Sequence, residues 1–146
     1  MKPLFSVVGL TLLSNLAMPV SIVRAADITC AVCGMNIPEH ARHHIILKRD
    51  GSGKPSLHVC SPSCARKAKK HDHYSAGEII DFNHPDKFLS VSQAYFLTKS
   101  ENIKKGMGDS AMPPYLAAFA TKEEAEVAQK RFGDGIVVQG FDNALK

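Results

Sequence analysis

Four cysteines are the residues of this sequence best suited to chemistry, and they occur as two closely spaced pairs. Two residues separate Cys30 from Cys33, and three separate Cys60 from Cys64. One pair in a turn and a second pair at a helix start are typical of knuckle-type metal sites. Zinc accepts a shell of four thiolates, and Cu(I) also prefers sulfur ligands. The cysteine pattern therefore predicts a soft-metal site without choosing between the two metals.

Two other roles compete with metal binding. Disulfides are common in exported proteins, and four cysteines allow three pairings. A bridge within either pair closes a very short loop and gains little, which leaves bridges between the pairs. A thioredoxin-like redox role requires the first cysteine at a helix N-terminus, where the helix dipole stabilises the thiolate. Gly34 and Pro38 predict a turn there instead, which disfavours thiol–disulfide catalysis.

Three methionines beyond the N-terminal apolar segment favour copper over zinc. Met35, Met107 and Met112 are each flanked by glycine or proline, so we expect them in loops rather than on amphipathic helices. A thioether suits Cu(I) and is a poor zinc ligand. Cys33 and Met35 are two residues apart and would point the same way from an extended segment. All three methionines are therefore candidate copper ligands.

Seven histidines add further candidate ligands, but their pattern does not select a second site. They are His40, His43, His44, His58, His71, His73 and His84. His43 and His44 are adjacent and would point to opposite faces of a strand, so at most one joins a given site. We expect each histidine to be exposed or to make a structural hydrogen bond. His58 is the best additional candidate, because it shares a strand face with Cys60.

A helix with a clear start signal must position the second cysteine pair. Ser61 is suited to cap this helix, and Pro62 to occupy its first position, where a missing N–H is no loss. Cys64 then lies near the third helical residue. Backbone N–H groups at that position favour a thiolate, which is the form that binds metals.

The chain also contains an internal repeat, in which residues 56–82 and 115–141 follow the same plan. Each copy has an extended stretch, a helix-start signal, a polar helix and a β-branched strand. In the second copy Thr121 and Glu124 form a capping box, and Gly133 ends the helix. The expected flanking strands lie within residues 43–49, 77–82, 93–100 and 135–141.

The expected fold class is α+β, with two tandem ββαβ units packed together. The first unit spans residues 26–84 and carries the four cysteines, and the second spans 85–146 and carries the methionine loop. Residues 83–92 are expected to connect them. Each half has too few large apolar residues for a core of its own, so we expect the halves to pack on each other.

Residues 1–25 predict an export signal. Lys2 precedes a long apolar run, and Val23 and Ala25 are small residues at the minus-three and minus-one positions of a cleavage site. Polar residues and a proline interrupt the run, which favours cleavage after Ala25 over a retained membrane anchor. No cysteine follows the run closely enough for lipid attachment. The expected product is a periplasmic protein with no stable membrane insertion.

The charge balance does not indicate a nucleic-acid partner. The chain has 18 basic and 14 acidic residues. Loss of Lys2 and Arg24 with the signal would leave a net charge of about +2. The basic segment 64–71 contains no interleaved aromatic residues, so we expect it to form a solvated helix face.

Three stretches of the sequence resemble the NosL family, which are exported copper chaperones associated with maturation of nitrous oxide reductase. The stretches are CGM at 33–35, MPPYLAAFATKEEAE at 112–126 and GIVVQGFDNAL at 135–145. The resemblance covers nearly all of the chain beyond the signal. It implies a tandem of ββαβ units and a Cu(I) site made by Cys33 and Met35, with Met112 closing it.

The N-terminal half also resembles the metal-binding modules of the TRASH and YHS types, from CAVCGM to HVCSPSC. That resemblance implies a metal cluster of Cys30, Cys33, Cys60 and Cys64. Cys33 would then belong both to this cluster and to the copper site with the methionines. The sequence leaves one metal site or two as alternatives.

Together these features predict an exported Cu(I) metallochaperone rather than an enzyme. Copper held by Cys33 and thioethers would pass by ligand exchange to a periplasmic cuproenzyme or its membrane assembly machinery. Nitrous oxide reductase is the usual recipient in the family that the chain resembles. The leading alternative is a structural zinc knuckle with an interaction role, in which Zn occupies the four-cysteine cluster. A thiol–disulfide oxidoreductase is the other alternative.

Overall fold

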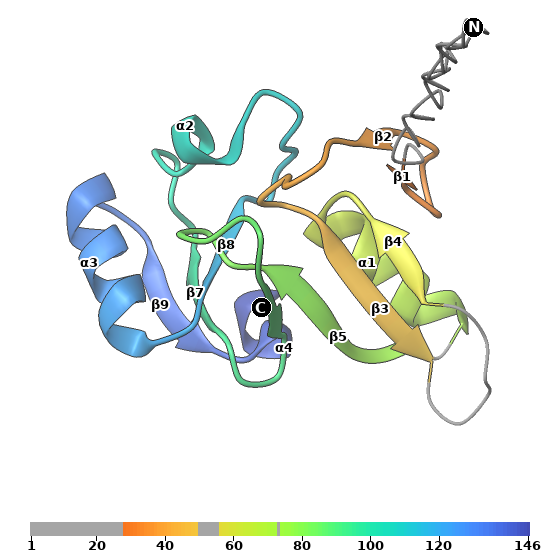
Figure 1. Ribbon diagram of the computed structural model, residues 1–146. Helices are drawn as coiled ribbons and strands as arrows, with labels where there is room; N and C mark the ends of the chain where they lie inside the picture. The colour runs from red at the N-terminus through yellow and green to blue at the C-terminus, as the bar shows by residue number, and fades with distance from the viewer. Residues whose placement is uncertain (1–27, 50–55, 73) are drawn as a thin grey trace, which may run out of the picture.

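The computed structural model describes residues 28–49, 56–72 and 74–146 (Figure 1). Within these residues it contains nine strands and four helices. No helix among them is both long enough and apolar enough to cross a bilayer. The predicted signal, residues 1–25, lies outside the described residues.

The first sheet has four antiparallel strands in the order β4-β3-β5-β6. They are β3 (Ile45–Arg49), β4 (Leu57–Val59), β5 (Tyr74–Ile80) and β6 (Phe88–Ser90). Along the central strand β3, Ile45 and Leu47 are buried while Lys48 is exposed. Residues two apart share a face of a strand, so this alternation turns one face of β3 towards the core. Helix α1 (Pro62–Asp72) packs on β3 and β5.

The second sheet has three antiparallel strands in the order β8-β7-β9. They are β7 (Tyr95–Thr98), β8 (Leu116–Phe119) and β9 (Ile136–Gln139). Helix α3 (Lys122–Phe132) covers this sheet at the end of the molecule away from β4 (Figure 1). Thr121 and Glu124 form the predicted capping box, and Gly133 ends the helix in a left-handed conformation with φ +79°. The first sheet contains the run β3-β4-α1-β5, and the second contains the run β7-β8-α3-β9. In each sheet the first strand of its run lies between the other two strands of that run.

The structure differs from the sequence-based expectation at several short elements. Residues 83–92 were expected to be a connection, but β6 within them pairs with β5, and Leu89 lies opposite Ile79. The strand expected at 135–141 ends at Gln139, and the chain then forms helix α4 (Phe141–Ala144). The unforeseen elements are β1 (Ile28–Thr29), β2 (Asn36–Ile37) and α2 (Lys104–Met107). Elements of two to four residues carry too little periodicity to be recognised locally.

The two sheets share a cluster of buried apolar side chains, as expected from the few large apolar residues in each half. One cluster of buried side chains runs from Cys30 in the first half to Ala144 in the second. Phe96 of β7 packs against Phe141 of α4, with ring centroids 5.9 Å apart. The Phe82 N–H donates to the Ala118 carbonyl at 2.8 Å and joins the sheets through the backbone. Packing and backbone pairing therefore hold the cysteine-bearing half against the second sheet.

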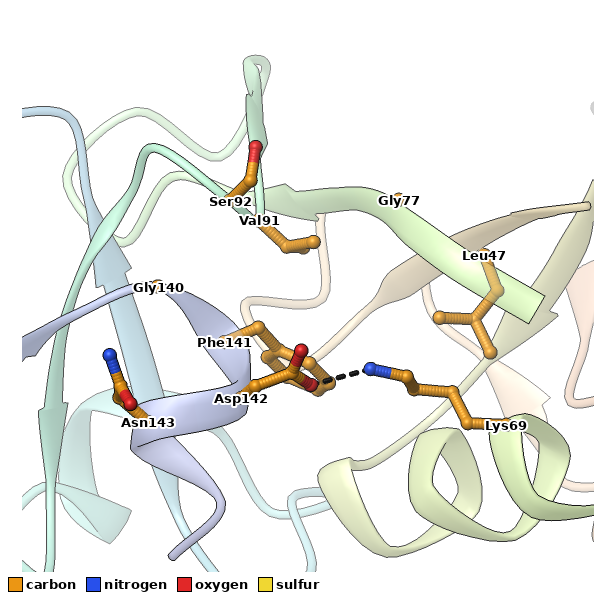
Figure 2. A pocket seen from close by; sticks show the side chains of 9 residues that line it. All are labelled: Leu47, Lys69, Gly77, Val91, Ser92, Gly140, Phe141, Asp142 and Asn143. Carbon is orange, nitrogen blue, oxygen red and sulfur yellow. Dashed lines mark hydrogen bonds and ion pairs between the residues drawn. The ribbon is translucent and has the colours of Figure 1, made fainter. Parts of the chain in front are cut away.

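A cavity of about 210 Å³ lies where α4 meets the first sheet (Figure 2). Lys69 of α1 reaches across it to an ion pair with Asp142 of α4. Gly77 of β5 lies on its wall, and a Cβ there would come within 1.6 Å of the Ile46 carbonyl oxygen. Only glycine therefore permits β5 to approach β3 this closely. These contacts fix the C-terminal helix against the half that carries the cysteines.

Candidate metal centre

The structure brings the four cysteines together into one cluster, the cysteine cluster (Cys30, Cys33, Cys60 and Cys64). Their Sγ atoms all lie within 4.8 Å of one another. All four thiols are free. The Sγ of Cys60 lies 3.4 Å from that of Cys33 and 3.8 Å from that of Cys64. A tetrahedral site with metal–sulfur bonds of about 2.3 Å separates its sulfurs by about 3.8 Å. The spacing of the thiols is therefore compatible with a metal held by sulfur ligands.

A tight turn presents the first cysteine pair, and we call residues 30–35 the knuckle turn. The Cys30 N–H donates to the Met35 carbonyl at 2.8 Å, and the Gly34 N–H donates to the Cys30 carbonyl at 2.9 Å. Gly34 has φ +73°, a conformation that favours glycine. The Ala31 N–H donates to the carbonyl of His58 and fastens the knuckle turn to β4. The prediction of a turn rather than a helix start is confirmed.

The second cysteine pair lies where β4 passes into α1. Cys60 directly follows β4, and Cys64 is the third residue of α1. The Cys64 N–H donates to the Ser61 hydroxyl at 3.1 Å, so the predicted N-cap is present. Figure 1 shows the β1–β2 hairpin, which carries the knuckle turn, beside β4. Strand pairing and a helix cap thus fix all four thiols in one place.

The thiols of the cysteine cluster differ in their tendency to ionise. Burial opposes ionisation of Cys30, but backbone N–H groups of the knuckle turn and of Cys60 outweigh it and lower the pKa of Cys30 to about 6. Burial, together with hydrogen bonds from neighbouring cysteines, raises the pKa of Cys60. Burial also raises the pKa of Cys64, against the effect of the Ser61 hydroxyl. A metal bound by Cys60 and Cys64 would have to displace their protons, so its binding would strengthen as pH rises.

The three candidate methionines occupy different environments. Met35 and Met112 have 40% and 46% of their surface exposed, in the loops expected for them. Met107 is only 4% exposed and ends helix α2, so the expectation of a loop is wrong for this residue. It packs in a second apolar cluster with Ile103 and Phe119, where thioether sulfur serves as a flexible filler. Burial in that cluster gives Met107 a packing role.

A contact across the chain brings the loop of Met112 to the helix of Cys64. The Ser63 hydroxyl donates to the Pro113 carbonyl at 3.4 Å. Ser63 directly precedes Cys64, and Pro113 directly follows Met112. Sequence reasoning missed this contact, because 50 residues separate its partners and neither carries a local signal.

Where the structure describes their side chains, the histidines form hydrogen bonds and none belongs to the cysteine cluster. His44 Nε2 and His58 Nδ1 are 2.9 Å apart, so one ring donates to the other. Burial and the neighbouring imidazoles lower the pKa of His44 to about 4, which keeps it neutral near pH 7. His58, the best additional candidate, therefore already has a side-chain partner. His43 is buried in the turn before β3, and its Nε2 lies 3.5 Å from the Ser110 hydroxyl.

Two further histidines, His40 and His84, follow the same pattern. His40 Nδ1 lies 3.1 Å from the Pro85 carbonyl. His84 Nδ1 lies 3.2 Å from a carboxylate oxygen of the buried Asp81. His73 lies outside the described residues.

Comparison with protein-family models found no match, and comparison with curated protein sequences found none either. Among solved structures, the crystal structure of the copper chaperone NosL from Shewanella denitrificans is similar, with a TM-score of 0.58. The two chains are 19% identical, and the match covers 76% of this chain and 85% of the other. The likeness shows that both share a mixed α+β fold, which confirms the α+β part of the expectation.

Proposed function

We propose that this protein is an exported metallochaperone that binds Cu(I) through sulfur and passes it to a partner, without catalysing a reaction. The observation that carries the proposal is the cysteine cluster, whose four free thiols lie within 4.8 Å of one another. Free thiols at this spacing bind soft metals, and Cu(I) prefers sulfur. The fold adds support, because a protein described as a copper chaperone shares it.

The exposed methionines are the reason to favour Cu(I) over zinc. Met35 belongs to the knuckle turn, and the neighbour of Met112 is hydrogen-bonded to Ser63 at the start of α1. Both thioethers therefore belong to segments that adjoin the cysteines, and both are accessible to an ion. Thioether sulfur suits Cu(I) and is a poor zinc ligand. In this proposal the ion binds at the cysteine cluster, where Cys30, Cys60 and Cys64 are its buried ligands. Cys33, Met35 and Met112 supply its ligands on the exposed side.

The proposed recipient is a periplasmic cuproenzyme or its membrane assembly machinery, with nitrous oxide reductase as the first candidate. In this view residues 26–84 and 85–146 are two ββαβ units, the first with the cysteines and the second with the Met112 loop. The resemblance of the CGM, MPPY and GIVVQGF stretches to the NosL family supports this choice.

A structural zinc knuckle is the second candidate function. It is favoured by the burial of Cys30, Cys60 and Cys64, because structural zinc sites are closed to solvent. The 3.8 Å between the Cys60 and Cys64 sulfurs also fits a tetrahedral zinc shell. In that case the exposed methionines would contribute nothing to metal affinity.

Replacing Met112 by leucine separates the two candidates. Leucine keeps the volume and apolarity but removes the sulfur, so the free energy of unfolding should change by less than about 1.5 kcal/mol. Competition with a Cu(I) chelator should show at least a tenfold loss of Cu(I) affinity, about 1.4 kcal/mol. Zinc affinity should stay the same, because zinc does not use the thioether.

Met107→Leu is the matched control, since it makes the same chemical change at a buried methionine. It should leave both metal affinities unchanged. If Met112→Leu also leaves Cu(I) affinity unchanged, the thioether argument fails and the zinc knuckle becomes the better account.

We further propose that the protein acts in the periplasm after its signal is cleaved between Ala25 and Ala26. Small residues at positions 23 and 25 support this site. Mass spectrometry of the exported protein should find Ala26 as the first residue, with no attached lipid. An intact N-terminus in the membrane fraction would show instead that the apolar segment is retained as an anchor.

A further inference from the structure

The cysteine cluster is asymmetric in its access to solvent. Cys30, Cys60 and Cys64 are 2%, 3% and 8% exposed. Cys33 is exposed. An incoming ligand can therefore approach the cluster at the sulfur of Cys33, whereas the other three sulfurs are covered by protein.

The backbone around the cluster also distinguishes Cys33 from the other three cysteines. The Cys30 N–H is bonded to the Met35 carbonyl, and the Cys64 N–H to the Ser61 hydroxyl in the first turn of α1. Cys60 follows β4, which is paired with β3. Cys33 lies inside the knuckle turn, outside the strands and helices of the described residues, and its side chain is exposed. The Cys33 side chain can therefore swing outward without breaking a strand or helix.

Resting on the proposed function, we propose that Cys33 is the exchangeable ligand of the cluster, through which the metal is received and released. The partner class is a protein that presents a cysteine thiol at its surface. In the first step of release the partner sulfur bonds to the metal, the bond from the metal to Cys33 breaks, and the partner's thiol proton passes to Cys33. The bonds to Cys30, Cys60 and Cys64 break afterwards, as further ligands of the partner replace these sulfurs and each freed sulfur takes a proton from the replacing group or from water. The oxidation state of the metal does not change, and loading is the reverse reaction.

The three buried ligands determine the order in which the sulfurs are displaced. Cys30, Cys60 and Cys64 hold the ion while Cys33 leaves, so the metal is never free in solution. Because these three are buried, a partner cannot displace them first without opening the core. Val32 and Met35, both partly exposed apolar side chains, flank Cys33 in the knuckle turn. They offer an apolar contact around the exchanging sulfur, as interface cores require.

The order of alkylation of the four cysteines tests the inference. The full mature protein is loaded with one equivalent of Cu(I), and in parallel with Zn²⁺, and then treated with iodoacetamide. Peptide mapping by mass spectrometry should show Cys33 modified at least tenfold faster than the other three cysteines. Adding glutathione as the partner thiol should raise the rate at Cys33 towards that of metal-free protein, while the buried cysteines stay protected.

Two other outcomes separate the inference from the proposed function. If the protein binds metal but all four cysteines react at one rate, or glutathione exposes all four together, Cys33 is not the exchangeable ligand. If the protein takes up no Cu(I) at all, the proposed function fails first. The Cys33→Ser protein serves as the assignment control, since its peptide map should lack the fast-reacting thiol.

Discussion

Replacing Cys60 by serine should remove most of the stability that a metal adds to this protein. Cys60 is the central thiol of the cysteine cluster, with sulfur contacts of 3.4 Å to Cys33 and 3.8 Å to Cys64. Metal binding stabilises the folded state, because the ligands are held together only there. Structural zinc sites contribute about 10–16 kcal/mol in small peptides. This protein has its own core, so we expect a smaller loss, of about 3 kcal/mol or more.

Denaturant unfolding with and without metal measures this effect. Wild type should gain stability when one equivalent of Zn²⁺ or Cu(I) is added, and Cys60→Ser should gain little. The metal-free proteins provide the control, because there the substitution only places a hydroxyl in a buried position, at a cost of about 1–3 kcal/mol. Equal stabilisation of both proteins by metal would show that Cys60 is not a ligand.

Replacing Phe96 by alanine should be the most damaging change outside the cysteine cluster. Phe96 is fully buried in β7 and packs on Phe141 of α4. Truncating a buried phenylalanine removes its transfer free energy and leaves a cavity, at a cost of about 3–5 kcal/mol. Val127→Ala is the control, because Val127 is 65% exposed and should change stability by no more than about 0.5 kcal/mol.

The same variant also tests whether the two sheets unfold together. Phe96 belongs to the second sheet but shares a cluster of buried side chains with Cys60 and Cys64. Phe96→Ala should therefore shift a single unfolding transition, followed both by circular dichroism and by the reactivity of the buried cysteines. Two separate transitions would contradict the shared core.

Several features of the site were predictable because their signals are local in the sequence. The N-cap at Ser61 and the capping box at Thr121 depend on residues three positions apart, and both are present. Gly34 and Pro38 indicated the turn at the first cysteine pair. The two cysteine pairs were therefore correctly assigned to a turn and a helix start.

Other features depended on segments distant in the sequence. Three such features are the pairing of β6 with β5, the burial of Met107 and the His44–His58 hydrogen bond. Each depends on contacts between residues that no short sequence pattern predicts. Met107, with glycines on both sides, had the composition of a loop. Its burial arises because Ile103 and Phe119 pack around it.

The sequence by itself determined the candidate ligand types, the helix caps and the α+β class, because these follow from residue chemistry and short-range hydrogen bonding. Only the tertiary structure decided that all four thiols share one cluster, and that Cys33 alone among them is exposed. Burial is the physical reason for this division. It depends on which segments pack over a side chain, and a residue's neighbours in sequence do not specify those segments.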